Sequence, residues 1–252
     1  MLTHPTLEKL QALRLTGMLK GLEEQLQMSG LEELGFAERL GLLVDREMTE
    51  RENRRLKDRL AKARLRQAAA VEDVDLRMPR GLDRSLFVSL CSCQWVSHHL
   101  NVLITGPTGA GKSFLACALA QKACREGFTA AYHRVPRLLS ELGTAKADGR
   151  YSKLLVNLSR IDVLVLDDWG MHPLGDAQRR DLLEIMEDRY GCRSTVVTSQ
   201  LPVDTWHDAI GDATLADALL DRLVHNAYQL KLKGESRRKH NALVPPAVES
   251  PS

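Results

Sequence analysis

Aromatic residues are scarce in this 252-residue chain, at 4% of the sequence, and long apolar runs are missing. Few aromatic side chains weaken any case for a protein that stacks on the bases of single strands. No stretch approaches the roughly 18 apolar residues of a transmembrane helix, and the first residues lack the layout of a signal peptide. Lysine and arginine outnumber aspartate and glutamate by only 35 to 33, so the overall charge identifies no partner.

Cysteines are few and irregularly placed. The five are Cys91, Cys93, Cys117, Cys124 and Cys192. The spacing of the first two is tighter than that of a zinc-binding pair, and no second pair follows them. An odd, scattered set also argues against a small disulfide scaffold. We therefore expect reduced structural thiols in a cytoplasmic protein.

The pattern changes along the chain. Residues 1–72 are rich in leucine, glutamate, lysine, arginine and glutamine, which favour helices, so an all-α region is expected there. Beyond residue 100, short apolar runs alternate with helical segments. The apolar runs cover residues 101–105, 129–135, 161–166 and 194–198. This alternation predicts an α/β fold with a central parallel sheet.

A phosphate-binding signature follows the first of these runs. The segment Gly-Pro-Thr-Gly-Ala-Gly-Lys-Ser matches G-x-x-x-x-G-K-[ST]. Its glycines let the backbone point successive N–H groups at phosphate oxygens, and the following helix adds its positive end. Lys112 is expected at the β- and γ-phosphates, and the Ser113 hydroxyl at Mg²⁺. The expected nucleotide-binding residues are Gly106, Pro107, Thr108, Gly109, Ala110, Gly111, Lys112, Ser113 and Phe114.

Two carboxylates end the run that begins at residue 161. Asp167 and Asp168 follow a buried strand, and the carboxyl end of such a strand lies beside the phosphate loop in parallel sheets. We assign Asp167 to Mg²⁺, while Asp168 is a candidate to orient or deprotonate the attacking water. The alternative is an acidic turn. The 55 positions from Lys112 to Asp167 leave room for an extra strand, as in the additional-strand ATPases.

Three further features keep more than one interpretation each. Thr198, Ser199 and Gln200 end a strand, where they either reach the γ-phosphate or form an ordinary polar turn. Arg222 is either offered to a neighbouring subunit's phosphate or is a surface partner of Asp221. Residues 51–66 carry eight positive and two negative side chains on an expected helix. These residues either bind the phosphates of nucleic acid, form a solvated helix face or bind an acidic partner.

Several longer runs together resemble one known family. These are residues 101–113, 163–170 (which contains Leu-Asp-Asp-Trp-Gly), 194–202, 220–228 and 232–239. From about residue 95 to 240, the chain resembles the IstB-like ATP-binding family, the ATPase helpers of bacterial insertion-sequence transposition. These are relatives of the DnaC helicase loaders within the AAA+ class. The N-terminal helices are similar to the leading helical domain of that family.

The resemblance implies a role for each matching position. Lys112 and Ser113 become the Walker A pair and Asp167 the Walker B metal partner. Asp168 stands where many AAA+ proteins have a catalytic glutamate, and this shorter carboxylate implies slow or DNA-stimulated hydrolysis.

The remaining implied roles concern phosphate sensing. Gln200 or Ser199 falls near the sensor of the fourth strand. Arg222 becomes the arginine finger acting in trans, and Arg238, or less directly Arg237, the second sensor. Because about 30 residues follow Arg222, no full-size C-terminal lid is expected.

The resemblance also implies an organisation and a function. It divides the chain into an N-terminal helical domain for partner or DNA binding (1–72), a linker (73–94), an AAA+ ATPase domain (95–240) and a flexible tail (241–252). The implied protein binds ATP and Mg²⁺, forms an ATP-dependent oligomer on double-stranded DNA, deforms it and recruits its cognate transposase. It would be bacterial, nucleoid-associated when on DNA, and without a membrane partner.

Two other functions remain open from the sequence. A DnaC-like loader, which grips a replicative helicase and single-stranded DNA, shares the same ATPase core and differs in the partner of its N-terminal helices. A small-molecule phosphotransferase is the third possibility. The paired aspartates, the sensor-like strand and Arg222 argue against it.

Overall fold

The computed structural model describes residues 5–28 and 34–234. The contacts divide the chain into two compact units, residues 1–61 and 62–252. Within the part that the structure describes, no helix is long and apolar enough to cross a membrane.

The first unit is helical, as the sequence predicts. It holds α1 (Pro5–Ala12), α2 (Thr16–Gln27) and all but the last two residues of α3 (Phe36–Ala63). Helix α2 packs against α3 through Gly17, where an added Cβ would lie 2.5 Å from Glu47 Cα. The Glu47 carboxylate accepts hydrogen bonds from the N–H groups of Gly17 at 2.7 Å and Met18 at 3.2 Å. A side chain of α3 therefore satisfies the N–H groups at the start of α2, as an N-cap residue normally does.

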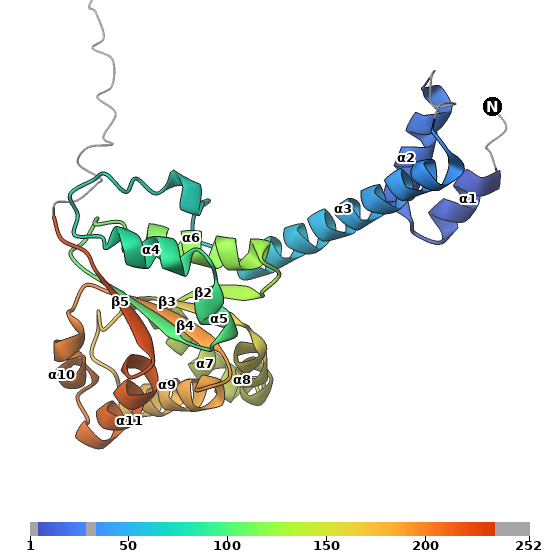
Figure 1. Cartoon of the computed structure of the whole chain (residues 1–252). Helices are drawn as coiled ribbons and strands as arrows, with labels where there is room; N and C mark the ends of the chain where they lie inside the picture. The colour runs from blue at the N-terminus through green and yellow to red at the C-terminus, as the bar shows by residue number, and fades with distance from the viewer. Residues whose placement is uncertain (1–4, 29–33, 235–252) are drawn as a thin grey trace, which may run out of the picture. The chain divides into compact units, whose positions relative to one another are not determined.

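The second unit is built on a five-stranded parallel sheet, shown in Figure 1. Its strands are β1 (Asn101–Thr105), β2 (Ala130–Arg134), β3 (Val163–Trp169), β4 (Ser194–Ser199) and β5 (Ala227–Lys231). They lie in the order β2-β3-β4-β1-β5. All four predicted strands are thus present, and the strand inserted between β1 and β3 is β4. This order places the ends of β1, β4 and β3 next to one another.

Helices cover both faces of this sheet (Figure 1). Helix α6 (Lys112–Arg125) lies on one face. The opposite face is covered by α7 (Val135–Ala147), α8 (Tyr151–Arg160), α9 (Asp176–Arg189), α10 (Trp206–Ile210) and α11 (Ala213–Val224). Successive side chains of each strand point to opposite faces of the sheet. Leu103, Leu164 and Val197 are buried in the core beneath α7 to α11. Two-sided burial explains why the runs 102–104 in β1 and 163–166 in β3 are entirely apolar in sequence.

The segment interpreted as a linker contains structure of its own. Helix α4 (Arg84–Leu90) forms there, after the short 3-10 helix η2 (Val71–Asp73), and α5 (Gln94–Ser97) begins at the last residue of that segment. Phe87 and Leu90 are buried, so α4 contributes to the core of the second unit. The sequence shows no long apolar run there because a seven-residue helix buries only a few side chains. The contacts also separate the units after Ala61, earlier than the expected boundary at residue 72.

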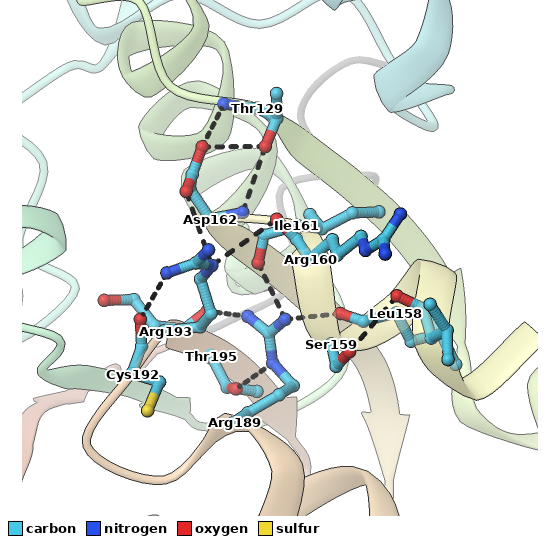
Figure 2. Close-up of polar contacts among 12 residues, drawn as sticks. Thr129, Leu158, Ser159, Arg160, Ile161, Asp162, Arg189, Cys192, Arg193 and Thr195 are labelled. Atoms are coloured by element: carbon cyan, nitrogen blue, oxygen red, sulfur yellow. Dashed lines mark hydrogen bonds and ion pairs between the residues drawn. The ribbon is translucent and has the colours of Figure 1, made fainter.

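A buried arginine holds the amino ends of the strands together (Figure 2). The guanidinium of Arg189, 1% exposed, donates to the carbonyl oxygens of Leu158, Ile161 and Ser194 and to Thr195 Oγ1. These acceptors come from α8, from the loop before β3 and from β4. The arginine therefore supplies hydrogen-bond donors to buried carbonyl oxygens at the ends of these elements.

The cysteines form no disulfide. Cys93, Cys117 and Cys124 are buried, Cys91 is intermediate and Cys192 is exposed. Burial raises the pKa of the Cys93 thiol to about 11, which keeps it protonated and unreactive at neutral pH. Free thiols agree with the prediction from their scattered positions.

Candidate nucleotide-binding site

The loop of residues 106–111 connects β1 to α6. Gly106 has φ +148°, and an added Cβ there would lie 2.6 Å from the carbonyl oxygen of Leu232, so only glycine fits. Lys112 is 9% exposed, and its Nζ donates to the carbonyl oxygens of Gly106 at 2.8 Å and Pro107 at 2.9 Å. The ammonium group therefore lies inside the curl of the loop. Burial lowers the pKa of Lys112, while Asp167 and Asp168 act in the opposite direction.

The Walker A serine and the first aspartate meet directly. Ser113 Oγ donates to the carboxylate of Asp167, at 2.8 Å from Oδ1 and 3.0 Å from Oδ2. Tyr132 from β2 and Thr198 from β4 also donate hydroxyl hydrogen bonds to this carboxylate. Arg66 adds an ion pair at 3.3 Å. The buried carboxylate is therefore held by groups from four separate segments of the chain.

These contacts keep Asp167 ionised. Burial alone raises its pKa, but hydrogen bonds from Thr198, Tyr132 and Ser113 outweigh that effect, and the pKa lies below its ordinary value. A serine hydroxyl beside an ionised carboxylate provides the hard oxygen ligands that Mg²⁺ prefers.

Asp168 points elsewhere. The pairing of β3 with β4 shifts register between Leu166 and Trp169, and Asp168 has φ +64°, an uncommon conformation for a residue other than glycine. Such a bulge re-aims a side chain at the end of a strand. The Asp168 carboxylate pairs with Nε of Arg134, the last residue of β2, at 2.7 Å. The two adjacent aspartates thus have different partners.

The three polar residues ending β4 separate into different roles. Thr198 binds Asp167, whereas the buried Ser199 donates to the carbonyl oxygen of Trp169 at 2.8 Å. Gln200 is exposed, and its Oε1 accepts a 2.7 Å hydrogen bond from Thr108 of the loop. Gln200 is therefore the residue of this set that touches the phosphate-loop side chains.

Arg222 lies at the other end of the sheet. The side chain of Asn101, at the amino end of β1, donates to the carbonyl oxygens of Arg222 and Leu223, whereas the loop follows the carboxyl end of β1. The guanidinium of Arg222 pairs with Glu187 at 2.9 Å. The structure therefore does not bring Arg222 to the loop of its own chain. Arg237 and Arg238 lie outside the described residues.

Sequence reasoning missed three residues of the site. Arg66, Tyr132 and Arg134 contact the two aspartates, although none belongs to a recognisable motif. Arg66 lies 101 positions before Asp167, and no local pattern indicates that pairing. The position of Arg134 at the end of a predicted strand was the one available signal, because strand ends of a parallel sheet gather at one edge.

The loop, Lys112 and the oxygen atoms of Ser113 and Asp167 fit the nucleotide and Mg²⁺ that the motif implies. The curl has room for no side chain at Gly106, Lys112 brings a positive charge, and Ser113 with Asp167 brings oxygen ligands. These features on a sheet with β4 between β1 and β3 define an ATP-binding protein of the AAA+ class of P-loop NTPases.

Comparison with known proteins identifies the family. A family model described as IstB-like ATP binding protein matches residues 8–244, and the chain belongs to this family. It is 53% identical over 240 residues to an insertion sequence ATP-binding protein, y4pL, of Sinorhizobium fredii, covering 95% of this chain and 98% of that one. It is 32% identical over 229 residues to the insertion sequence IS21 ATP-binding protein of Pseudomonas aeruginosa, covering 91% and 86%.

Solved structures share the fold. The crystal structure of DnaI superimposes with a TM-score of 0.58 at 22% identity, covering 67% of this chain and 92% of that one. The DnaC helicase loader does so with a TM-score of 0.55 at 20% identity, covering 66% and 97%. At these identities the similarity shows the AAA+ fold alone, and it confirms the fold class expected from the sequence.

Proposed function

We propose that this protein is an ATP-dependent helper of insertion-sequence transposition. It assembles on duplex target DNA, deforms that DNA and recruits or stimulates a transposase, with ATP hydrolysis as the switch. The observation that carries the proposal is the convergence of Ser113 and Lys112 with Asp167 in a chain whose relatives are insertion sequence ATP-binding proteins.

The proposed roles follow from the geometry of the site. Backbone N–H groups of residues 106–113 and Lys112 bind the phosphates, as in other P-loops. Ser113 and Asp167 would hold Mg²⁺, which neutralises charge on the phosphates when bound. Asp168 orients or deprotonates the attacking water once it is released from Arg134. Gln200, hydrogen-bonded to Thr108, is placed to respond to the γ-phosphate.

Assembly completes the site in this proposal. Arg222 lies at the opposite end of β1 from its own loop, which supports a role on the nucleotide of a neighbouring protomer. An arginine supplied in trans stabilises charge on the transferring phosphate. Hydrolysis then depends on assembly. Arg238, the candidate second sensor, adds a further contact in the same scheme.

DNA deformation requires many contacts. Bending a short duplex costs several kcal/mol, about 1–6 by elastic estimates, and phosphate contacts from several protomers offset this cost. The basic run 51–66 is one source of such contacts. Its last three residues follow the end of α3 rather than extending it, because Arg64 adopts φ +48°.

A helicase loader is the second candidate. The shared fold with DnaI and the DnaC helicase loader favours it. Such a protein would bind single-stranded DNA and a replicative helicase through the same ATPase core. Membership of the IstB-like family, with 53% identity to an insertion sequence ATP-binding protein, favours the transposition helper.

Co-sedimentation with the transposase encoded by the same insertion sequence tests the proposal. We expect the transposase to sediment with the protein on duplex DNA in ATP and to remain free in ADP. End-labelled duplex should also show increased energy transfer between its ends on binding. Binding of a replicative helicase with no ATP-dependent transposase contact would favour the loader.

A further inference from the structure

A basic hollow lies beside the nucleotide site in the second unit. It has a volume of about 600 Å³, and its lining includes Arg64, Arg66, Tyr132, Arg134, Arg137 and Glu141. Three segments form its walls: the residues that follow α3, the carboxyl end of β2, and one face of α7. The hollow opens at the same edge of the sheet as Asp167 and Asp168.

The charge in this hollow is strongly unbalanced. Four arginines line it against one glutamate, and each of the four is exposed. Neither Arg64 nor Arg137 forms an ion pair with any residue that the structure describes. Burial lowers the pKa of the neighbouring His133, Glu141 opposes this effect, and the charges of Arg64 and Arg137 lower the pKa further. These two guanidinium groups therefore provide positive potential for an anion from outside the chain.

The other two arginines connect the hollow to the carboxylates. Arg66 pairs with Asp167 at 3.3 Å, and Arg134 pairs with Asp168 at 2.7 Å. Both arginine side chains remain about half exposed, at 43% and 50%. The buried Asp167 carboxylate keeps its hydrogen bonds from Ser113, Tyr132 and Thr198 when Arg66 leaves, and the Asp168 carboxylate is partly exposed. Each half-exposed guanidinium can therefore exchange its carboxylate for another anion. Arginine binds phosphate oxygens in a bidentate manner, which suits this exchange.

We propose that the hollow binds backbone phosphates of duplex DNA and thereby releases Asp167 and Asp168 from Arg66 and Arg134. The inference rests on the proposed function, because it names the surface through which DNA acts on the nucleotide site. DNA in the hollow draws the two arginines toward its phosphates. The carboxylates are then free to hold Mg²⁺ and to orient water.

A binding titration with the full chain tests the surface. Fluorescence anisotropy of a labelled 30-base-pair duplex is measured in ATP and Mg²⁺ at several salt concentrations. The test variant is R64A/R137A, which removes the two arginines that touch neither aspartate. The matched control is R160A/R180A, which removes two exposed arginines of α8 and α9 that do not line the hollow. Unfolding curves for both variants establish that the fold is retained.

The expected loss is specific to the hollow. R64A/R137A should weaken duplex binding about tenfold or more and reduce the slope of log K against log salt by about 2, one for each lost phosphate contact. The control should change affinity less than about twofold. Equal duplex affinity and slope for wild type and R64A/R137A would overturn the assignment, as would a loss of ATP binding without a loss of duplex binding.

The same titration separates this inference from the proposed function. Absence of duplex binding by the wild-type chain overturns both. Duplex binding by the wild-type chain that R64A/R137A retains in full overturns only the hollow.

A second variant tests the coupling to hydrolysis. Arg134→Ala releases Asp168 without DNA, so the DNA-free ATPase rate should rise toward the DNA-stimulated rate, whereas Arg134→Lys should keep the low rate. R64A/R137A should keep the DNA-free rate and lose stimulation by duplex. A DNA-free rate in Arg134→Ala that is unchanged or lower contradicts the coupling.

Discussion

Ser113 Oγ lies 2.8 Å from Asp167 Oδ1, although 54 positions separate the two residues in the chain. This contact joins the first turn of α6 to the end of β3 across β4. It exists because parallel strands bring their carboxyl ends to one edge of the sheet, where α/β proteins bind ligands.

Loss of the loop lysine should abolish nucleotide binding. In Lys112→Ala the phosphates lose their buried positive charge, so we expect ATP affinity to fall at least tenfold and ATP-dependent assembly to disappear. Lys122→Ala, on the same helix, removes a surface ion pair with Glu126 and should leave ATP binding unchanged. Calorimetric titration with ATP measures both. Normal ATP binding by Lys112→Ala would contradict the assignment of the loop.

Arg222 should be required for hydrolysis but not for binding. Arg222→Ala should bind ATP normally and hydrolyse it at least tenfold more slowly in the assembled state. Glu187→Gln is the control, because it removes the surface partner of Arg222 and leaves the arginine.

Mixing inactive variants tests whether Arg222 acts in trans. Assemblies of Arg222→Ala with Asp168→Asn should regain ATPase activity, since both variants keep Lys112 for ATP binding and each supplies the group that its neighbour lacks. Mixtures as inactive as the separate variants, or a wild-type rate in Arg222→Ala alone, would exclude a trans-acting Arg222.

The buried arginine at the amino ends of the strands should be essential for stability. Arg189→Met leaves the carbonyl oxygens of Leu158, Ile161 and Ser194 without this donor, so we expect a loss of about 3 kcal/mol or more. Arg193→Ala, which removes a half-exposed partner of Asp162, should cost about 1 kcal/mol or less. Urea unfolding measures the difference. Similar losses for the two variants would show that the buried network contributes little.

The N-terminal unit should lose stability in acid through Glu47. Burial raises the pKa of this carboxyl, but the hydrogen bonds from Arg51, Met18 and Gly17 together bring it below its ordinary value of 4.5. Its contribution is therefore fully present above about pH 4.5 and is lost as the pH falls through the lower folded-state pKa. Glu47→Gln should destabilise this unit by about 1–3 kcal/mol at neutral pH, with a smaller difference in acid.

Urea unfolding measures the effect of Glu47→Gln, with limited proteolysis within residues 5–28 as the probe of the N-terminal unit. Glu50→Gln removes an exposed pair with Lys20 and serves as the control. A pH-independent difference between wild type and Glu47→Gln would rule out the ionised carboxylate as the cause.

Local patterns predicted the parts of the site that a few neighbouring residues determine. The loop 106–113, the strand before Asp167 and all four predicted strands follow from short motifs and apolar runs. Helix α4 was missed because its burial depends on contacts with distant elements, which a seven-residue segment does not reveal.

The partners of the aspartates were missed for a related reason. Arg66, Tyr132 and Arg134 reach Asp167 and Asp168 from segments more than 30 positions away. An arginine in a basic run looks the same in sequence whether it faces solvent or a carboxylate. The order of strands in the sheet, which places β2 beside β3, brings Tyr132 and Arg134 to the aspartates, whereas Arg66 reaches Asp167 from the residues that follow α3.

The size of complexes formed on DNA tests the central claim most directly. Mass photometry compares wild type and Lys112→Ala on double- and single-stranded DNA of equal length, with and without ATP. We expect large assemblies of the wild-type protein on duplex in ATP, and none with Lys112→Ala or without ATP. Preference for single strands, or assembly only after a helicase is added, would contradict the transposition helper and favour a helicase loader.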